Sequence, residues 1–72
     1  MSTFSEKIKH LRKNKNVTQK HLAVEIGLSE RTYQHLEAGS TVPTVDTLIK
    51  LCNYFNVSSD YLLGLSDAPE RR

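Results

Sequence analysis

Residues 18–38 read TQKHLAVEIGLSERTYQHLEA, and this stretch decides the fold of the 72-residue chain. Thr18 and Ser29 stand where N-cap residues are expected, because a hydroxyl there can accept from a backbone N–H of the first helical turn. Each follows an apolar residue and has another apolar residue four positions later, the spacing of a hydrophobic staple. The two predicted helices, 19–26 and 30–38, are separated only by Gly27-Leu28-Ser29. So short a turn, opening with glycine, makes two helices cross steeply, as in a helix-turn-helix.

The apolar residues of this stretch fall where two crossing helices must bury them. The inward-facing positions are Leu22, Ile26, Leu28, Tyr33 and Leu36. Ala23 is small where the two helices approach most closely, and Gly27 adopts a positive φ at little cost. A generic helical hairpin would satisfy the apolar positions but would rarely also place Ala23 and Gly27 here. The pattern therefore predicts a helix-turn-helix over 19–38.

The same local signals recur outside this motif. Thr44 and Ser58 are further capping positions, and Thr3-Phe4-Ser5-Glu6 has the spacing of a capping box. The predicted helices cover residues 4–15, 19–26, 30–38, 45–55 and 59–64. Gly27, Gly39 and Gly64 fall where a left-handed residue ends a helix, and no segment alternates as a half-buried strand does. We expect an all-α, compact five-helix bundle.

Size and composition indicate one small domain. We expect the domain to cover residues 1–65, followed by a flexible tail over 66–72. Hydrophobic residues make up 38% of the chain, enough for one small core. No run approaches the ~20 apolar residues of a membrane span, and no secretory signal segment begins the chain. The single cysteine, Cys52, excludes an internal disulfide framework and lies on an apolar helix face. These features favour a cytoplasmic protein with no membrane partner.

The charge is distributed unevenly along the chain. Residues 1–31 carry seven Lys or Arg and three Asp or Glu, whereas residues 32–72 carry three and five. A basic half indicates a surface for a polyanion. A solvated, lysine-rich helix would explain the same charges, so their interpretation depends on where the motif places them.

The second helix of the motif has a polar outward face. Its exposed positions are Ser29, Glu30, Arg31, Thr32, Gln34 and His35. Arg can donate two hydrogen bonds to guanine, Gln can pair with adenine, Glu can accept from cytosine, and the Thr methyl can contact thymine. Every surface helix has some polar face, but the second helix of a helix-turn-helix is the one that enters the major groove. We therefore expect these six residues to contact DNA bases.

Signals for catalysis or cofactors are weak. His10, His21 and His35 lie on three different predicted helices, without a carboxylate or cysteine at ligand spacing. The chain has no glycine-rich phosphate loop and no arrangement typical of nucleophilic catalysis. We expect neither an enzyme nor a metal or cofactor site.

Together these motifs resemble the phage repressor and Cro-like helix-turn-helix family, also called XRE-type. The matching residues are Thr18-Gln19-Lys20, Leu22-Ala23, Gly27-Leu28-Ser29, Thr32-Tyr33, Leu36-Glu37-Ala38-Gly39, Pro43, Leu48, Leu51 and the close Phe55-Asn56-Val57-Ser58-Ser59-Asp60-Tyr61-Leu62-Leu63-Gly64. The resemblance covers about residues 4–65. It implies a lambda-repressor-like domain whose third helix enters the major groove, in a transcriptional regulator, most often a repressor, that binds a palindromic operator as a dimer.

The resemblance also implies which residues contact the DNA backbone. These are Arg12, Thr18, Gln19, Lys20, Ser40 and Thr41. In the family, the glutamine at the position of Gln19 contacts a phosphate and often touches the first residue of the next helix, here Glu30. The pair Arg12 and Glu37 matches a family salt bridge, and the loop 40–43 matches one whose backbone N–H groups meet phosphate. Glu30 and His35 depart from the usual base contacts, so the recognised bases stay open.

The acidic half provides candidates for a dimer contact. Not all of its apolar residues fit into one short bundle, and we expect Val42, Tyr54, Leu63 and Leu65 to be shared between subunits. Two alternatives use the same fold, an antitoxin and an adaptor that no longer binds DNA. Arg31 and Gln19 argue against the adaptor, and residues 66–72 are short for a toxin-binding segment. Relief of repression would then need an antagonist protein, dilution or a competing regulator.

Overall fold

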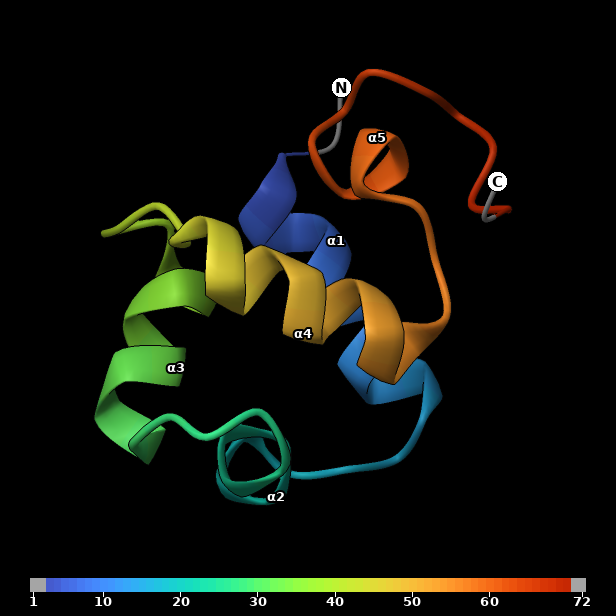
Figure 1. The fold of residues 1–72 in the computed structure, drawn as a ribbon. Coiled ribbons are helices and arrows are strands. Elements are labelled where there is room, and N and C mark those ends of the chain that lie inside the picture. The colour runs from blue at the N-terminus through green and yellow to red at the C-terminus, as the bar shows by residue number, and fades with distance from the viewer. Residues whose placement is uncertain (1–2, 71–72) are drawn as a thin grey trace.

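The computed structural model describes residues 3–70, which form five helices and no strand (Figure 1). The helices are α1 (Phe4–Asn14), α2 (Gln19–Glu25), α3 (Glu30–Ala38), α4 (Val45–Phe55) and α5 (Ser59–Leu62). The predicted all-α, five-helix architecture is confirmed. Residues 1, 2, 71 and 72, which the predicted domain and tail include, lie outside the described residues.

Each helix begins at the predicted N-cap. The capping residues are Thr3, Thr18, Ser29, Thr44 and Ser58. All five have an extended backbone, and each side-chain oxygen accepts from the backbone N–H three residues later. Thr3 and Glu6 form the full capping box. One local rule, a hydroxyl that satisfies an unpaired N–H, therefore fixes all five helix starts.

Helix ends were predicted less well. The helices predicted to end at 15, 26 and 64 end earlier, at Asn14, Glu25 and Leu62. The difference is largest for α5. Asn16 and Asn56, which lie between predicted helices, have φ of 58° and 55° and reverse the chain before the next cap. Asparagine tolerates this left-handed conformation better than most residues with a side chain. The asparagines themselves were therefore the sequence signal for these two left-handed turns.

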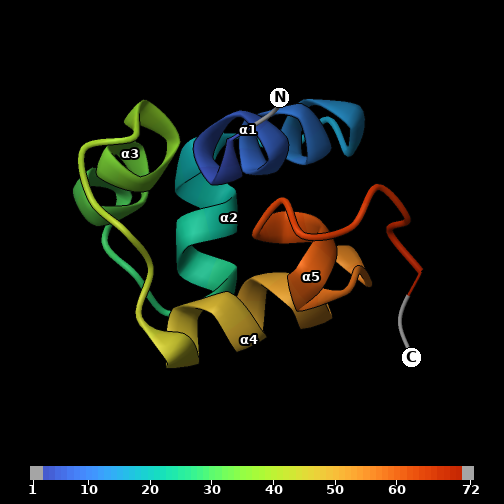
Figure 2. The ribbon, with the colours of Figure 1, turned by 90° about the horizontal axis from the view of Figure 1, so that it is seen from above.

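The helices pack around a shared centre. In Figure 2, α1 and α4 lie on opposite sides of α2 and α5, while α3 and the C-terminal segment occupy opposite ends of the molecule. The main contacts join α2 to α3, α1 to both α3 and α5, and α4 to α5. The largest fully buried side chains are Ile8, Leu22, Tyr33, Leu51 and Leu62, one from each helix. The core therefore depends on all five helices.

Two apolar residues that flank α5 have opposite environments. Leu65, a predicted dimer contact, is 76% exposed, because the chain has already turned at Gly64. Val57, just before the N-cap of α5, is buried in the core. Phe4, Leu11, Leu28, Leu48 and Phe55 surround the core as half-buried residues.

The segment after α5 folds back on the domain. The Ser58 N–H donates to the Pro69 carbonyl at 3.0 Å, and the Ser66 N–H donates to the Asp60 carbonyl at 3.2 Å. Sequence analysis gave no indication of these contacts, and the flexibility of this segment stays a prediction. Within residues 3–70, no helix is long and apolar enough to cross a membrane.

We predict that Thr18→Ala and Ser29→Ala each lower the free energy of unfolding by about 0.5–2 kcal/mol, because each removes an N-cap acceptor. Urea denaturation measures the change. Thr41→Ala, in an exposed loop, is the control and should leave the midpoint nearly unchanged. Midpoints that do not move in either cap variant would contradict the capping assignment.

Candidate nucleic-acid interface

The turn between α2 and α3 has the geometry that its sequence predicts. Gly27 has a φ of +75°, and the Leu28 N–H donates to the Ala23 carbonyl at 2.8 Å, which closes the end of α2. Ala23 is buried where the two helices meet. The motif over 19–38 is therefore a closely packed unit, with the inner sides of both helices in the core.

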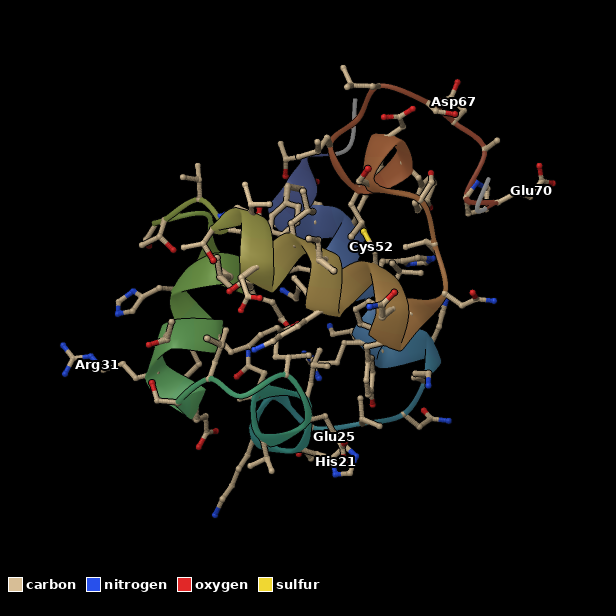
Figure 3. The ribbon with its side chains drawn as sticks, in the orientation of Figure 1. His21, Glu25, Arg31, Cys52, Asp67 and Glu70 are labelled. Atoms are coloured by element: carbon tan, nitrogen blue, oxygen red, sulfur yellow. The ribbon has the colours of Figure 1, made fainter. Side chains whose placement is uncertain are left out.

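The outer face of α3 is open to solvent. All six candidate base-contacting residues, Ser29, Glu30, Arg31, Thr32, Gln34 and His35, are exposed. Figure 3 shows Arg31 pointing from α3 away from the rest of the molecule. The Ser29 hydroxyl accepts from the Thr32 N–H at 3.1 Å and donates to the Thr32 hydroxyl at 2.8 Å, so capping already engages these two.

The polar groups of the other four candidates are not engaged by the described part of the protein. Within residues 3–70, the side chains of Glu30, Arg31, Gln34 and His35 make no hydrogen bond or ion pair with the protein. Hydrogen-bonding groups of this kind can pair with base edges without first breaking an internal contact. These four residues are therefore the strongest candidates for base contacts.

Behind α3, a buried ion pair joins the motif to α1. Arg12 donates from Nε to Glu37 Oε2 at 2.5 Å and from Nη2 to Glu37 Oε1 at 3.2 Å. Its third donor, Nη1, reaches the Val17 carbonyl at 2.9 Å, just before the N-cap of α2. The side chains of Arg12 and Glu37 are only 13% and 4% exposed. The predicted pair is present, but Arg12 supports the motif from inside, and the structure does not favour it as a phosphate contact.

Gln19 also binds the Glu37 carboxylate. Its Nε2 donates to Glu37 Oε1 at 3.2 Å. The expected contact with Glu30 is not made in this structure, because Glu30 is exposed whereas Glu37 is held beside the start of α2. Gln19 is half-buried at the first position of α2, between the interior and the surface.

The environment keeps both members of the pair charged. Burial alone would raise the pKa of Glu37, but Arg12, the nearby Tyr33 hydroxyl and Gln19 outweigh it and hold the pKa below its ordinary value of 4.5. The hydrogen bond to Glu37 raises the pKa of Arg12. Burial raises the pKa of Tyr33, which packs beside the pair, so its phenol stays neutral.

The remaining backbone-contact candidates divide into two groups. Thr18, Lys20, Ser40 and Thr41 are all exposed. The Thr18 hydroxyl caps α2 by accepting from the His21 N–H at 3.0 Å. In the loop 40–43, the Ser40 N–H donates to the His35 carbonyl at 3.0 Å and so closes the end of α3. The expectation that this loop offers its N–H groups to phosphate therefore does not suit Ser40, and Thr41 is the better candidate.

Two lysines, one in α1 and one at its C-cap, face away from the motif. Lys7 Nζ lies 4.7 Å from the centroid of the Tyr61 ring and donates to the Tyr61 carbonyl at 2.9 Å. Lys15 Nζ lies 4.5 Å from the centroid of the Tyr54 ring. These cation–π contacts hold α1 to the C-terminal half. The basic half is thus not a single surface for a polyanion, as its charge alone suggested.

Several exposed apolar residues lie on or beside α4, and they differ in part from the predicted set; Val24, on α2, is exposed as well. Val42, Leu63 and Leu65 are exposed as expected, but Tyr54 is half-buried and packs edge-on against Phe55, with ring centroids 5.1 Å apart. Sequence analysis missed Val45 and Ile49, one turn apart on the outer side of α4. We call Val42, Val45, Ile49 and Leu63 the α4 face. Val42, Val45 and Leu63 line one shallow groove, and Val45 and Ile49 line the next.

Comparison with known proteins agrees with this geometry. The family described as Helix-turn-helix matches residues 8–62, which include the starts of all helices except α1. This chain belongs to the helix-turn-helix family.

Individual relatives of this helix-turn-helix chain are regulators. It is 37% identical to the uncharacterized HTH-type transcriptional regulator YobD of Bacillus subtilis, over 93% of this chain and 60% of that protein. It is 37% identical to the cryptic phage CTXphi transcriptional repressor RstR of Vibrio cholerae, over 85% and 54%. The chain thus spans little more than half the length of these relatives. Its structure matches the P22 c2 repressor in complex with a synthetic operator, with a TM-score of 0.86, 27% identity and coverage of 92% and 100%.

The described polar side chains away from α3 also lack the pattern of a metal site. Within residues 3–70, no three His, Cys, Asp or Glu side chains gather as metal ligands would. His21 and Glu25 approach each other on the exposed side of α2, at 3.7 Å (Figure 3). This is an ordinary surface pair one helical turn apart.

The buried carboxylate predicts how stability depends on acid. Because the pKa of Glu37 is lower in the folded protein than its ordinary 4.5, the unfolded chain binds more protons near that pH. The stabilisation is therefore complete above pH 4.5 and is lost as the pH falls through the lower folded value. We expect urea midpoints to drop over this range.

The paired substitution R12M/E37M provides the comparison, since it removes both buried charges together. It should flatten the acid dependence, leaving the part due to Glu6, whose pKa is lowered by the Thr3 backbone and side-chain hydrogen bonds. The same acid slope in both proteins would show that Glu37 does not cause it.

Proposed function

We propose that this domain binds double-stranded DNA sequence-specifically and regulates transcription, most simply as a repressor in the cytoplasm. The single observation that carries the proposal is the outer face of α3, where four polar side chains have no partner within the described residues. Support comes from the relatives, which include a phage repressor, and from the match to a repressor held on operator DNA.

In this proposal, α3 enters the major groove and presents Arg31, Gln34, Glu30 and His35 to base edges. Arg31 is the best specifying residue, since a guanidinium donates two parallel hydrogen bonds to guanine O6 and N7. Thr18, Gln19 and Lys20 at the start of α2 would contact phosphates on one side. Thr41 would do so from the loop after α3. Phosphate contacts fix the position of the protein and carry no sequence information.

We further propose that two copies bind a palindromic operator, with the α4 face forming the contact between them. Dimers of helix-turn-helix proteins place two recognition helices about 34 Å apart, one turn of DNA. Val42 and Val45 are 86% and 75% exposed, and isolated domains rarely leave neighbouring apolar side chains so open. Leu65 is exposed and stays a candidate for the contact, whereas Tyr54 is engaged by Lys15 and Phe55. A protein that covers the α4 face would act as an antagonist.

We predict that selection from a random DNA pool returns a motif with dyad symmetry, bound by two copies. Binding should weaken by roughly a thousandfold between 50 and 200 mM salt if about six phosphates are contacted, because each contact releases counterions. Enrichment followed by binding assays across this salt range makes the measurement.

The outcomes separate the alternatives. Failure to enrich any motif at low salt would overturn the DNA-binding proposal and favour the adaptor. An asymmetric motif saturated by one copy would overturn the dimer alone.

On the selected motif, Arg31→Ala should cost about 1–3 kcal/mol and relax the preference at one base pair in each half-site. Lys20→Ala is the matched control: it removes a positive charge of α2 and should weaken specific and random duplexes alike. Competition assays with single-base variants give the comparison. Equal losses on both duplexes for Arg31→Ala would contradict its role in base recognition.

A further inference from the structure

One carboxylate gathers contacts from both helices of the motif and from α1. Glu37, near the end of α3, accepts from Arg12 of α1 and from Gln19 at the start of α2. The Gln19 side chain is half-buried, so it reaches the surface while its amide nitrogen is engaged from behind.

We propose that Glu37 is a positioning residue for DNA binding, which fixes the direction of the Gln19 carboxamide before the phosphate arrives. The inference rests on the proposed function, in which Gln19 contacts the DNA backbone. It assigns to Glu37 a part in affinity that is separate from its part in holding the fold together.

The chemistry of a primary amide explains the need for positioning. The Gln19 amide carries two N–H donors on nitrogen and an acceptor oxygen, and rotation about its last bond exchanges them. Only the nitrogen suits a phosphate, because the amide oxygen would face another oxygen. A carboxylate behind Gln19 takes one N–H and thereby fixes the nitrogen side, which leaves the second N–H for the phosphate. Fixing this rotation beforehand lowers the entropic cost of binding.

The acceptor itself is held firmly. Arg12 donates two hydrogen bonds to Glu37, in the planar geometry that a guanidinium and a carboxylate share. The third donor of Arg12 holds the Val17 carbonyl, two residues before Gln19. The same guanidinium therefore positions both the carboxylate and the chain that leads into α2, and Glu37 is 4% exposed, so water cannot easily replace it.

A purely structural ion pair would have a different consequence. If Glu37 only stabilised the fold, its loss would weaken DNA binding equally whether or not Gln19 were present. If Glu37 positions Gln19, its loss should matter only when Gln19 is there to be positioned. A double-mutant cycle measures this difference.

The cycle compares wild type, Gln19→Ala, R12M/E37M and the combined variant on the selected operator and on a random duplex. R12M/E37M removes both buried charges together, because leaving one of them unpaired is strongly destabilising. R12L/E37L, which also removes both charges together and leaves no acceptor for Gln19, is the second route if the methionine variant is unstable. Each protein is assayed under conditions where its denaturation curve shows it folded.

We expect Gln19→Ala to weaken binding roughly tenfold on both duplexes, the effect of one hydrogen bond to a charged group. R12M/E37M should cause a similar loss when Gln19 is present and a loss of less than about twofold in the Gln19→Ala background. In an Arg31→Ala background, the full loss should return, since Arg31 does not touch this carboxylate.

Equal losses from R12M/E37M with and without the Gln19 side chain would overturn the proposal and leave Glu37 a structural role. An unchanged affinity for Gln19→Ala, while wild type binds, would also overturn it without affecting the proposed function. Absence of DNA binding by wild type itself would remove the proposed function and the inference together.

Discussion

The ion pair of Arg12 and Glu37 is the interaction on which the remaining structure depends. It connects α1, the entry to α2 and the end of α3 through one guanidinium and one carboxylate. Buried charges lose their hydration, so such a pair contributes only when geometry and additional hydrogen bonds are good. Here the Val17 carbonyl and the Gln19 amide provide those additional bonds. We therefore expect the pair to favour one arrangement of the three helices more than it adds to their overall stability.

This arrangement separates support from recognition within a single short helix. On the inner side of α3, Tyr33, Leu36 and Glu37 are buried. On its outer side, Arg31, Gln34 and His35 are exposed to solvent. Changes on the outer side leave the buried contacts intact. The fold can thus be kept while the recognised sequence changes, which is consistent with a repressor-like structure retained at 27% identity to the P22 c2 domain.

Much of this fold was predictable because its signals are local. A capping hydroxyl and the N–H that it satisfies are three residues apart, so Thr18 and Ser29 could be assigned from sequence alone. The contacts of Lys7 and Lys15 could not be predicted, because their partners Tyr61 and Tyr54 lie far away in the chain. Gln19 opens α2 as predicted, but its contact with Glu37 instead of Glu30 depends on which carboxylate the packing places beside it. The outer side of α4 was missed because the apolar spacing of Val45 and Ile49 is the same as that of a buried face.

The core contains one fully buried large side chain from every helix, and this has a consequence for how the domain comes apart. No helix can leave without exposing its own central residue and opening space beside the other four. A partly unfolded intermediate that keeps a closed interior is therefore disfavoured, and the domain should melt in one cooperative transition. With such all-or-none behaviour, a cellular protease can cleave the domain only in its rare, fully unfolded state.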